Sequence, residues 1–489
     1  MSQPIHALLD EQARARPNAP ALSDSLGNIW SYSDLARASA ALADKLSDLG
    51  VRRNDRVLAV VENCAPAVAA IFASSRVGAA VVPVNARQTA PEIDRIIAHA
   101  GPAMLLFSDK VSPEASAHAA RFDAEPVLEG LSGKALLSSP DDSLSDVATL
   151  LYTTGTTGPP KGVMLTHDNL IFGGGATCTT RNVTPADVLY GVLPISHVFG
   201  LTSIVMAAVI AGASVRLAPR FSPAKLYEAL TSGVTLLSAV PQMHAQLMHY
   251  TRGQGHTRLP ATTLRYVSSG AAPLDIDWKR RAEAFFGIPL QNGYGMTETT
   301  AGVCLTSHTE SNDDISVGTP FPGVSVKLDK AAAGAEGDVG EVLVGGGGIM
   351  KGYFRNPAET AKALDAEGWL HSGDLGRYDA AGNLHISGRA KELIIHGGFN
   401  VYPPEVEAAL NDHPQVIQCA VIGVKRDGDE LVVAFVEVSA DDAPDIDTLR
   451  SFAAERLAGY KRPSQIVLTE KLPAAPTGKI LKSKLKDLL

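Results

Sequence analysis

The segment from residue 151 to 167 reads LYTTGTTGPPKGVMLTH, and its residue types suit one kind of ligand. Every position from Thr153 to Gly158 is threonine or glycine, and Lys161 follows two prolines. Glycine lets a polyanion approach the backbone closely, and consecutive N–H groups and hydroxyls can surround phosphate oxygens. The lysine adds a compact positive charge. Because the apolar residues before this run predict a buried strand, the segment predicts a phosphate-binding loop that follows a strand.

A Walker-type loop is the nearest alternative for this segment. That motif has four residues between its first glycine and a Gly-Lys pair, and a serine or threonine follows to bind the metal. Here two residues separate Gly155 from Gly158, and Lys161 stands between a proline and a glycine. The spacing therefore excludes a Walker loop. On this segment alone, a surface loop rich in glycine and threonine remains open.

Five further segments carry side chains that nucleotide chemistry uses. One ends an apolar run with small residues that suit a flat ligand, and one combines an aromatic ring, a hydroxyl and a carboxylate. The others offer an aspartate, an arginine beside a lysine, and a lysine near the end of the chain. They are SSGAAPL (268–274), NGYGMTET (292–299), HSGDLGRYD (371–379, with Asp374), SGRAKE (387–392, with Arg389 and Lys391) and PTGKILK (476–482, with Lys479).

Together these segments resemble the adenylate-forming superfamily, which includes acyl- and aryl-CoA ligases, adenylation domains and beetle luciferases. The resemblance covers essentially the whole chain, and the motifs occur in the order and approximate spacing of the family. Within it, the chain looks like a stand-alone carboxylate–CoA ligase. The resemblance implies that a carboxylate attacks the α-phosphorus of ATP to give an acyl-adenylate and pyrophosphate. The thiol of coenzyme A then displaces AMP.

The resemblance also implies roles for single residues. Glu298 would bind Mg²⁺, whose preference for oxygen ligands suits a carboxylate with phosphates. Thr297 would bond the α-phosphate, Asp374 would accept the ribose hydroxyls beside Arg389, and Lys479 would bridge the acid and the α-phosphate. The full set expected to bind ATP or AMP, in which Tyr294 stacks on adenine, is Thr153, Thr154, Gly155, Thr156, Thr157, Gly158, Lys161, Gly270, Ala271, Ala272, Asn292, Gly293, Tyr294, Gly295, Thr297, Asp374, Arg389 and Lys479.

A mobile C-terminal domain follows from the same resemblance. Lys391 stands where the family has a hinge, about which the domain turns between the two half-reactions. Gly397 and Gly398 match a loop that flanks the pantetheine of coenzyme A. The surroundings of Lys479 resemble those of lysines that an acetyltransferase modifies, which makes such an enzyme a candidate partner. The other lysines near the chain end are expected to be solvated tail charges: Lys482, Lys484 and Lys486.

The acyl pocket is expected to have mostly apolar walls with a few hydroxyls, which suits an aromatic or medium-chain aliphatic monocarboxylic acid. His197 matches a family histidine between this pocket and the coenzyme A channel, and it joins Lys479, Thr297 and Glu298 as a catalytic candidate. The residues expected to line the pocket are His197, Phe199, Ser203, Gly270, Gly295, Gly302 and Val303.

Two substrate classes are disfavoured by what the chain lacks. Amino-acid adenylation domains hold the α-ammonium with an aspartate near His197, and residues 198–203 include none. Malonate ligases hold the second carboxylate with arginines, whereas Gln246 and Asn292 or Gly293 stand at the corresponding positions here. A benzoate- or hydroxycinnamate-like acid and a medium-chain fatty acid both remain open. Two other functions also remain open. One is an acyl-AMP ligase or luciferase-like enzyme that uses an acceptor other than coenzyme A, and the other is a nucleotide-binding protein without catalysis.

The elements that must position these residues alternate between helical and β-branched segments. The alternation runs from residue 32 to 84 and returns in later apolar runs, which predicts an α/β fold with parallel layers. Short strands split by glycine and proline predict a β-rich subdomain from Ile315 to Ile349. We expect an AMP-binding domain over residues 1–387 and a small, mobile α+β domain over residues 388–489, with the hinge near Lys391.

Composition narrows the class of protein. The 489 residues exceed what one hydrophobic core sustains, so at least two domains are expected. A net charge of −9 argues against a general nucleic-acid binder. Four widely spaced cysteines predict reduced thiols, and the chain shows neither a signal peptide nor an apolar run long enough to span a membrane. These features predict a cytoplasmic protein, and they leave its oligomeric state open.

Overall fold

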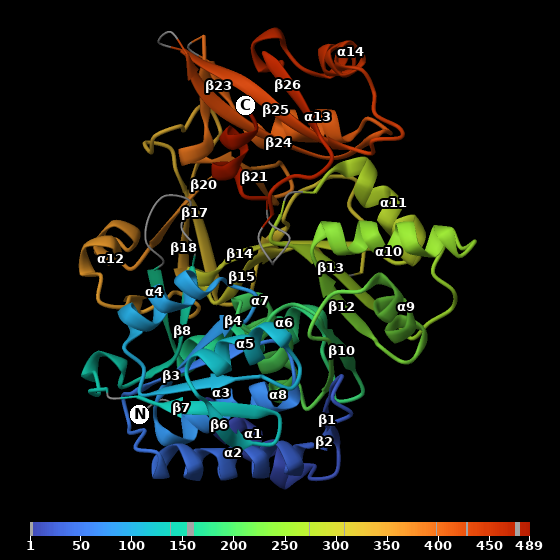
Figure 1. The fold of residues 1–489 in the computed structure, drawn as a ribbon. Helices are drawn as coiled ribbons and strands as arrows, with labels where there is room; N and C mark the ends of the chain where they lie inside the picture. The colour runs from blue at the N-terminus through green and yellow to red at the C-terminus, as the bar shows by residue number, and fades with distance from the viewer. Residues whose placement is uncertain are drawn as a thin grey trace.

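The computed structural model describes residues 3–136, 138–153, 161–272, 274–307, 309–397, 399–426, 429–474 and 480–489, and Figure 1 shows their arrangement. Two large mixed sheets form most of the molecule. The eight-stranded sheet has the order β19-β9-β8-β4-β3-β5-β7-β6, with parallel strands at its centre. Its strands are β3 (Arg56–Val61), β4 (Ala80–Asn85), β5 (Met104–Phe107), β6 (Glu125–Leu128), β7 (Leu131–Ala135), β8 (Val147–Thr153), β9 (Lys161–Thr166) and β19 (Gly352–Tyr353).

The nine-stranded sheet has the order β16-β15-β14-β13-β12-β10-β11-β1-β2. Strands β11, β10, β12, β13 and β14 are parallel, and β10, β12 and β13 are almost entirely buried, as expected for strands that are covered on both faces. The strands are β1 (Pro20–Ser23), β2 (Ile29–Ser31), β10 (Val188–Gly191), β11 (Ser214–Leu217), β12 (Leu236–Ala239), β13 (Tyr266–Gly270), β14 (Leu290–Met296), β15 (Ala301–Leu305) and β16 (Thr319–Pro320).

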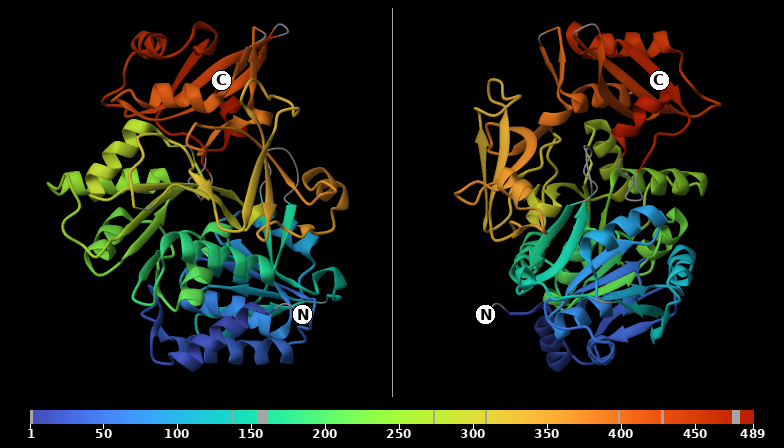
Figure 2. Two further views of the ribbon diagram at one scale, coloured as in Figure 1. Left: turned by 180° about the vertical axis from the view of Figure 1, so that it is seen from behind. Right: turned by 60° about the vertical axis from the view of Figure 1, so that its left-hand side comes forward.

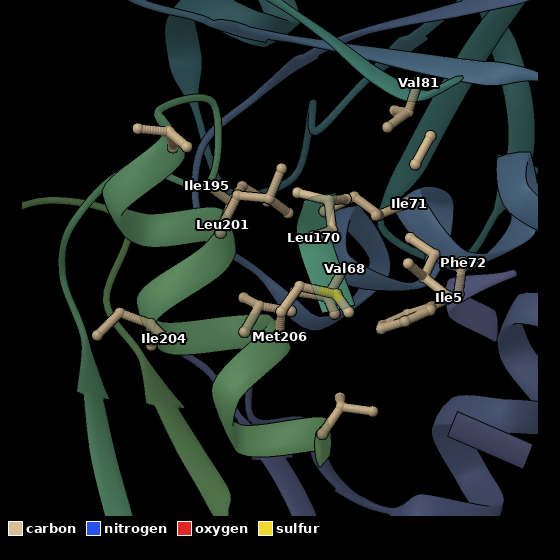
Figure 3. Packing of buried hydrophobic residues seen from close by; sticks show 14 of the residues in the cluster. Ile5, Val68, Ile71, Phe72, Val81, Leu170, Ile195, Leu201, Ile204 and Met206 are labelled. Atoms are coloured by element: carbon tan, nitrogen blue, oxygen red, sulfur yellow. The ribbon is translucent and has the colours of Figure 1, made fainter. Parts of the chain in front are cut away.

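One hydrophobic core joins the facing sides of the two sheets through the helices between them. Helix α3 is mostly apolar and is buried from Ala65 to Ser75, and Figure 3 shows its side chains packed with those of neighbouring helices. The helical segments of this layer are α1 (Ile5–Ala15), α2 (Tyr32–Asp48), α3 (Ala65–Val77), α6 (His167–Arg181), the short α7 (Val198–Gly200), the π-helix η2 (Leu201–Met206) and α8 (Ala207–Ala211).

The outer faces of both sheets are covered by separate clusters. Apolar side chains of α4 (Ala90–Ala100) and α5 (Pro113–Arg121) pack on the eight-stranded sheet. Those of α9 (Pro223–Thr231), α10 (Pro241–Gly253) and α11 (Ile276–Phe286) pack on the nine-stranded sheet. Helices and sheets therefore alternate in layers, which confirms the α/β class predicted from the alternating segments. No helix among the described residues is long and apolar enough to cross a bilayer.

A four-stranded antiparallel sheet forms the β-rich part, in the order β17-β18-β20-β21. Its strands are β17 (Val324–Asp329), β18 (Gly340–Gly346), β20 (Leu370–Tyr378) and β21 (Leu384–Arg389), and α12 (Pro357–Ala363) lies between the two pairs in the sequence. The predicted range 315–349 covers only the first pair. The second pair contains the HSGD and SGR motifs, so the sheet itself carries two site residues.

The C-terminal part has hydrophobic clusters of its own on both faces of a small sheet. Strand β24 (Val416–Arg426) pairs antiparallel with β25 (Asp429–Val438), which pairs parallel with β26 (Gln465–Thr469). The hairpin β22 (Ile394–His396) and β23 (Phe399–Val401) and the helices α13 (Pro403–Asn411) and α14 (Ile446–Arg456) complete it. Figure 2 shows this part at the opposite end of the molecule from α2. The fold therefore combines a large N-terminal α/β domain with a small C-terminal α+β domain.

Candidate active site

The predicted phosphate loop connects two paired strands. Strands β8 and β9 are antiparallel, and their register ends at the pair Thr153 and Lys161. The strand predicted before the loop is therefore present as β8. Thr154, Gly155, Thr156, Thr157 and Gly158 lie outside the described residues, as do Gly398 and Lys479. The structure places the two strand ends, Thr153 and Lys161, that the predicted loop connects.

Lys161 and Glu298 lie on either side of one tyrosine. The hydroxyl of Tyr353 donates a hydrogen bond to Glu298 Oε1 over 2.9 Å, and Lys161 Nζ lies 4.8 Å from the centre of the Tyr353 ring. Strand β19 brings this ring into place, because Tyr353 pairs with Val163 of β9. Burial and the neighbouring Glu298 carboxylate raise the pKa of the Tyr353 hydroxyl, so it remains a donor at neutral and alkaline pH.

Glu359 completes this group on the solvent side. Its carboxylate forms an ion pair with Lys161 and a second one with Lys362. Hydrogen bonds from these two lysines lower the pKa of Glu359 to about 2. In the described chain, Lys161 therefore faces the aromatic ring of Tyr353 and the half-buried Glu359 carboxylate. A bound triphosphate would replace part of this contact as the partner of the lysine.

The surroundings of Glu298 fit an oxygen-binding metal such as Mg²⁺. The side chain is buried, and Oε1 accepts the Tyr353 hydrogen bond. Among the described residues, Oε2 accepts no hydrogen bond, which leaves one carboxylate oxygen for an external partner. Mg²⁺ commonly takes one or two protein carboxylates, and phosphates and waters complete its shell. Thr297, in the 3₁₀ turn η3 (Thr297–Thr299), lies beside it at 8% exposure.

Asp374 is held between a tyrosine and an arginine that come from different strands. The hydroxyl of Tyr294 donates to Asp374 Oδ2 over 2.6 Å, and Arg389 Nε lies 3.1 Å from Asp374 Oδ1. Strands β20 and β21 place Asp374 directly opposite Arg389, while Tyr294 comes from β14 of the nine-stranded sheet. Burial, followed by the Asp374 charge, raises the pKa of Tyr294. The structure thus unites three predicted nucleotide residues from two sheets.

The backbone next to this group is exposed where β13 ends. Gly270 pairs with Gly293 of β14, and the exposed Ala271 and Ala272 follow it. Ala271 has φ of 65°, a left-handed conformation that is strained for alanine. In open α/β sheets, ligands bind outside the carboxyl ends of the strands. Residues 268–272 of the predicted SSGAAPL segment therefore lie where a ligand of this fold class is expected.

The side chain of Asn292 is hydrogen-bonded within the fold. Its amide nitrogen donates to the carbonyls of Ile315 and Ser316, each over 3.0 Å, and the side chain is buried. This residue ties the end of β14 to the segment before β16. The side chain of Asn292 therefore has a structural role at this end of β14.

The residues predicted for the acyl pocket divide into two groups. A Cβ atom on Gly270 would lie 3.3 Å from Cε1 of Phe199, so these two residues face one another. His197 is the N-cap of α7, and its Nδ1 accepts a hydrogen bond from the Phe199 backbone N–H over 3.3 Å. By contrast, a Cβ on Gly302 would lie 2.4 Å from the Phe321 ring, and Val303 is fully buried in the main core.

Gln246 was predicted to lie opposite a second carboxylate. It is exposed on α10, whereas His244 and Leu247 of the same helix are buried. This exposure gives no support to the exclusion of malonate-like acids that used Gln246.

The hinge region and the chain end are connected by ion pairs. Lys391 is exposed in the 3₁₀ turn η4 (Ala390–Glu392) that follows β21. Lys482 Nζ lies 3.0 Å from Glu392 Oε2 and 2.7 Å from Glu407 Oε1. The expectation that Lys482 is a solvated tail charge is wrong, because these carboxylates hold it. Gly397 has φ of 57°, and a Cβ atom there would meet no atom of the described residues within 4 Å, which leaves space beside the hairpin β22–β23.

Three residues of interest carried no sequence signal. Tyr353 and Glu359 belong to no recognised motif, and Arg181 stands in the last turn of α6, where a basic residue is ordinary. Only the folded chain shows that Tyr353 contacts both Lys161 and Glu298, and that Arg181 is buried.

Comparisons with known proteins agree with this geometry. The AMP-binding enzyme family matches residues 9–354, and the AMP-binding enzyme C-terminal domain matches residues 405–479. The chain is 34% identical over 487 residues to a feruloyl-CoA synthase of an Amycolatopsis species, with 97% of each chain covered. It is 32% identical over 508 residues to 4-coumarate–CoA ligase 1 of Arabidopsis thaliana, covering 95% of this chain and 88% of that protein.

A solved structure adds the bound nucleotide. O-succinylbenzoate coenzyme A synthetase of Bacillus subtilis, in complex with ATP and a magnesium ion, matches with a TM-score of 0.84 and 28% identity. The match covers 98% of this chain and 99% of that one. Both halves of the chain, and the order of the motifs, are thus accounted for by one family. The chain belongs to the AMP-binding enzyme family of the adenylate-forming superfamily, in the branch of the AMP-forming acid–thiol ligases, which join carboxylic acids to coenzyme A with ATP.

Proposed function

We propose that this protein is an ATP- and Mg²⁺-dependent ligase that converts an aromatic carboxylic acid to its coenzyme A thioester. The observation that carries the proposal is the contact of Tyr353 with both Lys161 and Glu298. It brings Lys161, at the strand end next to the predicted phosphate loop, close to Glu298, the carboxylate predicted to bind the metal. A cation and an acceptor carboxylate in this arrangement suit a polyphosphate with its metal.

In the first half-reaction, the acid attacks the α-phosphorus of ATP and pyrophosphate leaves. The carboxylate and the triphosphate of ATP are both anions, so the site must position them and neutralise their charge. Lys161 and the loop before it would hold the β- and γ-phosphates, and Thr297 would bond the α-phosphate. Bound at Glu298, Mg²⁺ would withdraw negative charge from the phosphates. Asp374, fixed by Tyr294 and Arg389, would accept the ribose hydroxyls.

Lys479 is proposed to bridge the acid and the α-phosphate in this step. In the second half-reaction the C-terminal domain, residues 388–489, would turn about Lys391 relative to residues 1–387. Gly397 and Gly398 would then flank the pantetheine of coenzyme A. The separate hydrophobic clusters of the C-terminal part and the exposed position of Lys391 support this division.

An aromatic acid of the benzoate or hydroxycinnamate type is favoured over a medium-chain fatty acid. The curated relatives are named for feruloyl and 4-coumarate substrates. Phe199 packs against Gly270, where a Cβ atom would lie only 3.3 Å from the ring, so the two residues would form one apolar wall for a flat acid. Gly295 would continue this wall, with Ser203 farther inside and His197 between the acid and coenzyme A.

Two further proposals concern the protein in the cell. Acetylation of Lys479 by a lysine acetyltransferase would remove the bridging charge and with it the first half-reaction. A cytoplasmic location is proposed because ATP and coenzyme A are available there. The four free cysteines, three of them buried, suit a reducing compartment.

An ATP–pyrophosphate exchange assay over a panel of aromatic and aliphatic acids tests the proposed function. We expect exchange that depends on Mg²⁺ and on an aromatic acid, and release of AMP with thioester formation when coenzyme A is added. Exchange without coenzyme A-dependent AMP release would indicate another acceptor. The absence of acid-dependent exchange across the panel would contradict the proposal and favour a nucleotide-binding protein without catalysis.

A further inference from the structure

Arg181 is a buried cation for which the described residues provide no carboxylate partner. It ends helix α6, and only 4% of the residue is exposed. In the part of the chain that the structure describes, its guanidinium forms no ion pair, and its Nε–H has no hydrogen-bond acceptor. The nearby Arg265, by contrast, is paired with Asp187 over 2.6 Å. A buried, unpaired charge is costly, so a protein that keeps one usually has a partner for it.

The contacts of Arg181 lead to the predicted acyl pocket. Its Nη1 donates to Ser238 Oγ over 2.8 Å and lies 3.5 Å from the carbonyl oxygen of Ser203. Its Cζ lies 5.9 Å from the centre of the Phe199 ring and 5.3 Å from that of Tyr266. Phe199 and Ser203 are two of the residues predicted for the acyl wall. The cation therefore lies behind that wall.

The strand register shows where Arg181 lies relative to the reacting end of the pocket. Residues Tyr266, Ser268 and Gly270 alternate along β13 and so share one face of the sheet. Ser238 of β12 is directly opposite Ser268, and their hydroxyls are 3.0 Å apart. Two residues of strand span about 7 Å, so the serine pair lies about that far inside Gly270. The para position of a single-ring acid bound at Gly270 would reach toward this pair.

Tyr266, beside Arg181, also carries a polar group that the described chain leaves unsatisfied. The hydroxyl of Tyr266 is buried and has no hydrogen-bond partner among the described residues, and its ring contacts Arg181. The Arg181 Nε–H and this hydroxyl are thus two unsatisfied groups whose side chains touch one another. Arginine can only donate hydrogen bonds, so any group that satisfies it must be a hydrogen-bond acceptor.

We propose that Arg181 is a specificity-determining residue that binds an acceptor oxygen at the end of the acid remote from its reacting carboxylate. The inference rests on the proposed ligase function. A phenol oxygen and a second carboxylate share the required chemistry, and the serine pair can donate to either. An acid without such an oxygen would leave the guanidinium and the Tyr266 hydroxyl unsatisfied in a buried site, so it would bind poorly.

A matched series of acids tests this directly. The kcat/KM for thioester formation is measured for cinnamate and benzoate and for their 4-hydroxy and 4-carboxy derivatives. A charge-assisted hydrogen bond predicts that the wild-type enzyme prefers a derivative over its parent acid on the order of 10- to 100-fold. Preference for the 4-hydroxy acid identifies a phenol as the ligand group, and preference for the 4-carboxy acid identifies a carboxylate.

The variant Arg181→Met should bring the ratio of derivative to parent acid close to one. Arg265→Met is the matched control, because Arg265 also binds the end of α6, through the carbonyls of Arg181 and Asn182. This control variant should lower kcat/KM for all the acids alike and leave the ratio of derivative to parent acid unchanged. If Arg181→Met does not fold, the inference is still tested by the ratio of derivative to parent acid in the wild-type enzyme and in Arg181→Lys. Lysine keeps the positive charge but lacks the planar guanidinium fork.

Equal kcat/KM for parent and derivative acids in the wild-type enzyme would overturn the inference while the ligase function stands. So would a ratio that Arg181→Met leaves unchanged, since Arg181 would then only support the fold. If no acid of the series gives AMP or a thioester, the proposed function itself fails. The two failures are therefore distinguishable.

Discussion

Tyr353→Phe isolates the hydrogen bond that orients the proposed metal ligand. The change removes the hydroxyl that donates to Glu298 Oε1 over 2.9 Å and keeps the ring 4.8 Å from Lys161 Nζ. Glu298 is 8% exposed, so water replaces the lost donor poorly. A hydrogen bond to a buried charged group is worth about 1.5–3 kcal/mol. Because about 1.4 kcal/mol is tenfold in an equilibrium constant, this predicts a loss of about 10- to 100-fold in metal affinity.

The assay is ATP–pyrophosphate exchange with a good acid substrate, measured against the concentration of free Mg²⁺. The half-saturating Mg²⁺ concentration should rise by about 10- to 100-fold. Part of the maximal rate should return at high Mg²⁺, since the carboxylate itself remains. Tyr378→Phe is the control, because its hydroxyl donates to the Val326 carbonyl over 3.3 Å within the small antiparallel sheet. An unchanged half-saturating concentration in Tyr353→Phe would refute the assignment of Glu298 and Tyr353.

Three further predictions follow from other parts of the chain. Lys391→Pro should preserve pyrophosphate exchange and lower the rate of thioester formation on the order of 10²-fold, because proline fixes φ at the pivot. A parallel fall in both activities would count against a hinge. Lys482→Met should lower the free energy of unfolding by about 1–3 kcal/mol in denaturant titration, since it leaves two part-buried glutamates unpaired, whereas Lys484→Met should not. Burial alone would raise the pKa of Asp187, but hydrogen bonds from Arg265 and the Thr184 backbone hold it at about 2, below its ordinary 3.8. The stability that Asp187 adds is therefore full above about pH 4 and lost as the pH falls toward 2, and Asp187→Asn should flatten this part of the stability curve; an unchanged curve would contradict the assignment.

Much of the fold could be predicted from the sequence, because the alternating pattern is strong where strands are buried on both faces. The β-rich part was predicted only over residues 315–349. Its second half, β20 and β21, contains polar motif residues such as Asp374 and Arg389, and these hide the strand pattern. The strands that carry chemistry are thus the ones that hydrophobic periodicity describes least well.

The site was predicted where residues belong to motifs, and missed where contacts join distant segments. Asp374 and Arg389 were assigned by resemblance, and the structure places them opposite one another. Tyr353 had no signal, since an aromatic residue after glycine is common in core strands. Lys482 was misjudged because most lysines near a chain end are solvated. The exposure of Gln246 could not be predicted, because an alignment without a structure does not give the rotation of a helix.

The most direct test of the central claim follows one oxygen atom. The account requires that a carboxylate oxygen attacks the α-phosphorus of ATP, so that this oxygen leaves with AMP when coenzyme A takes the acyl group. With an acid labelled with ¹⁸O in its carboxylate, mass spectrometry should find one labelled oxygen in the phosphate of AMP and unlabelled pyrophosphate. Label in inorganic phosphate together with ADP, or AMP without label, would contradict the account.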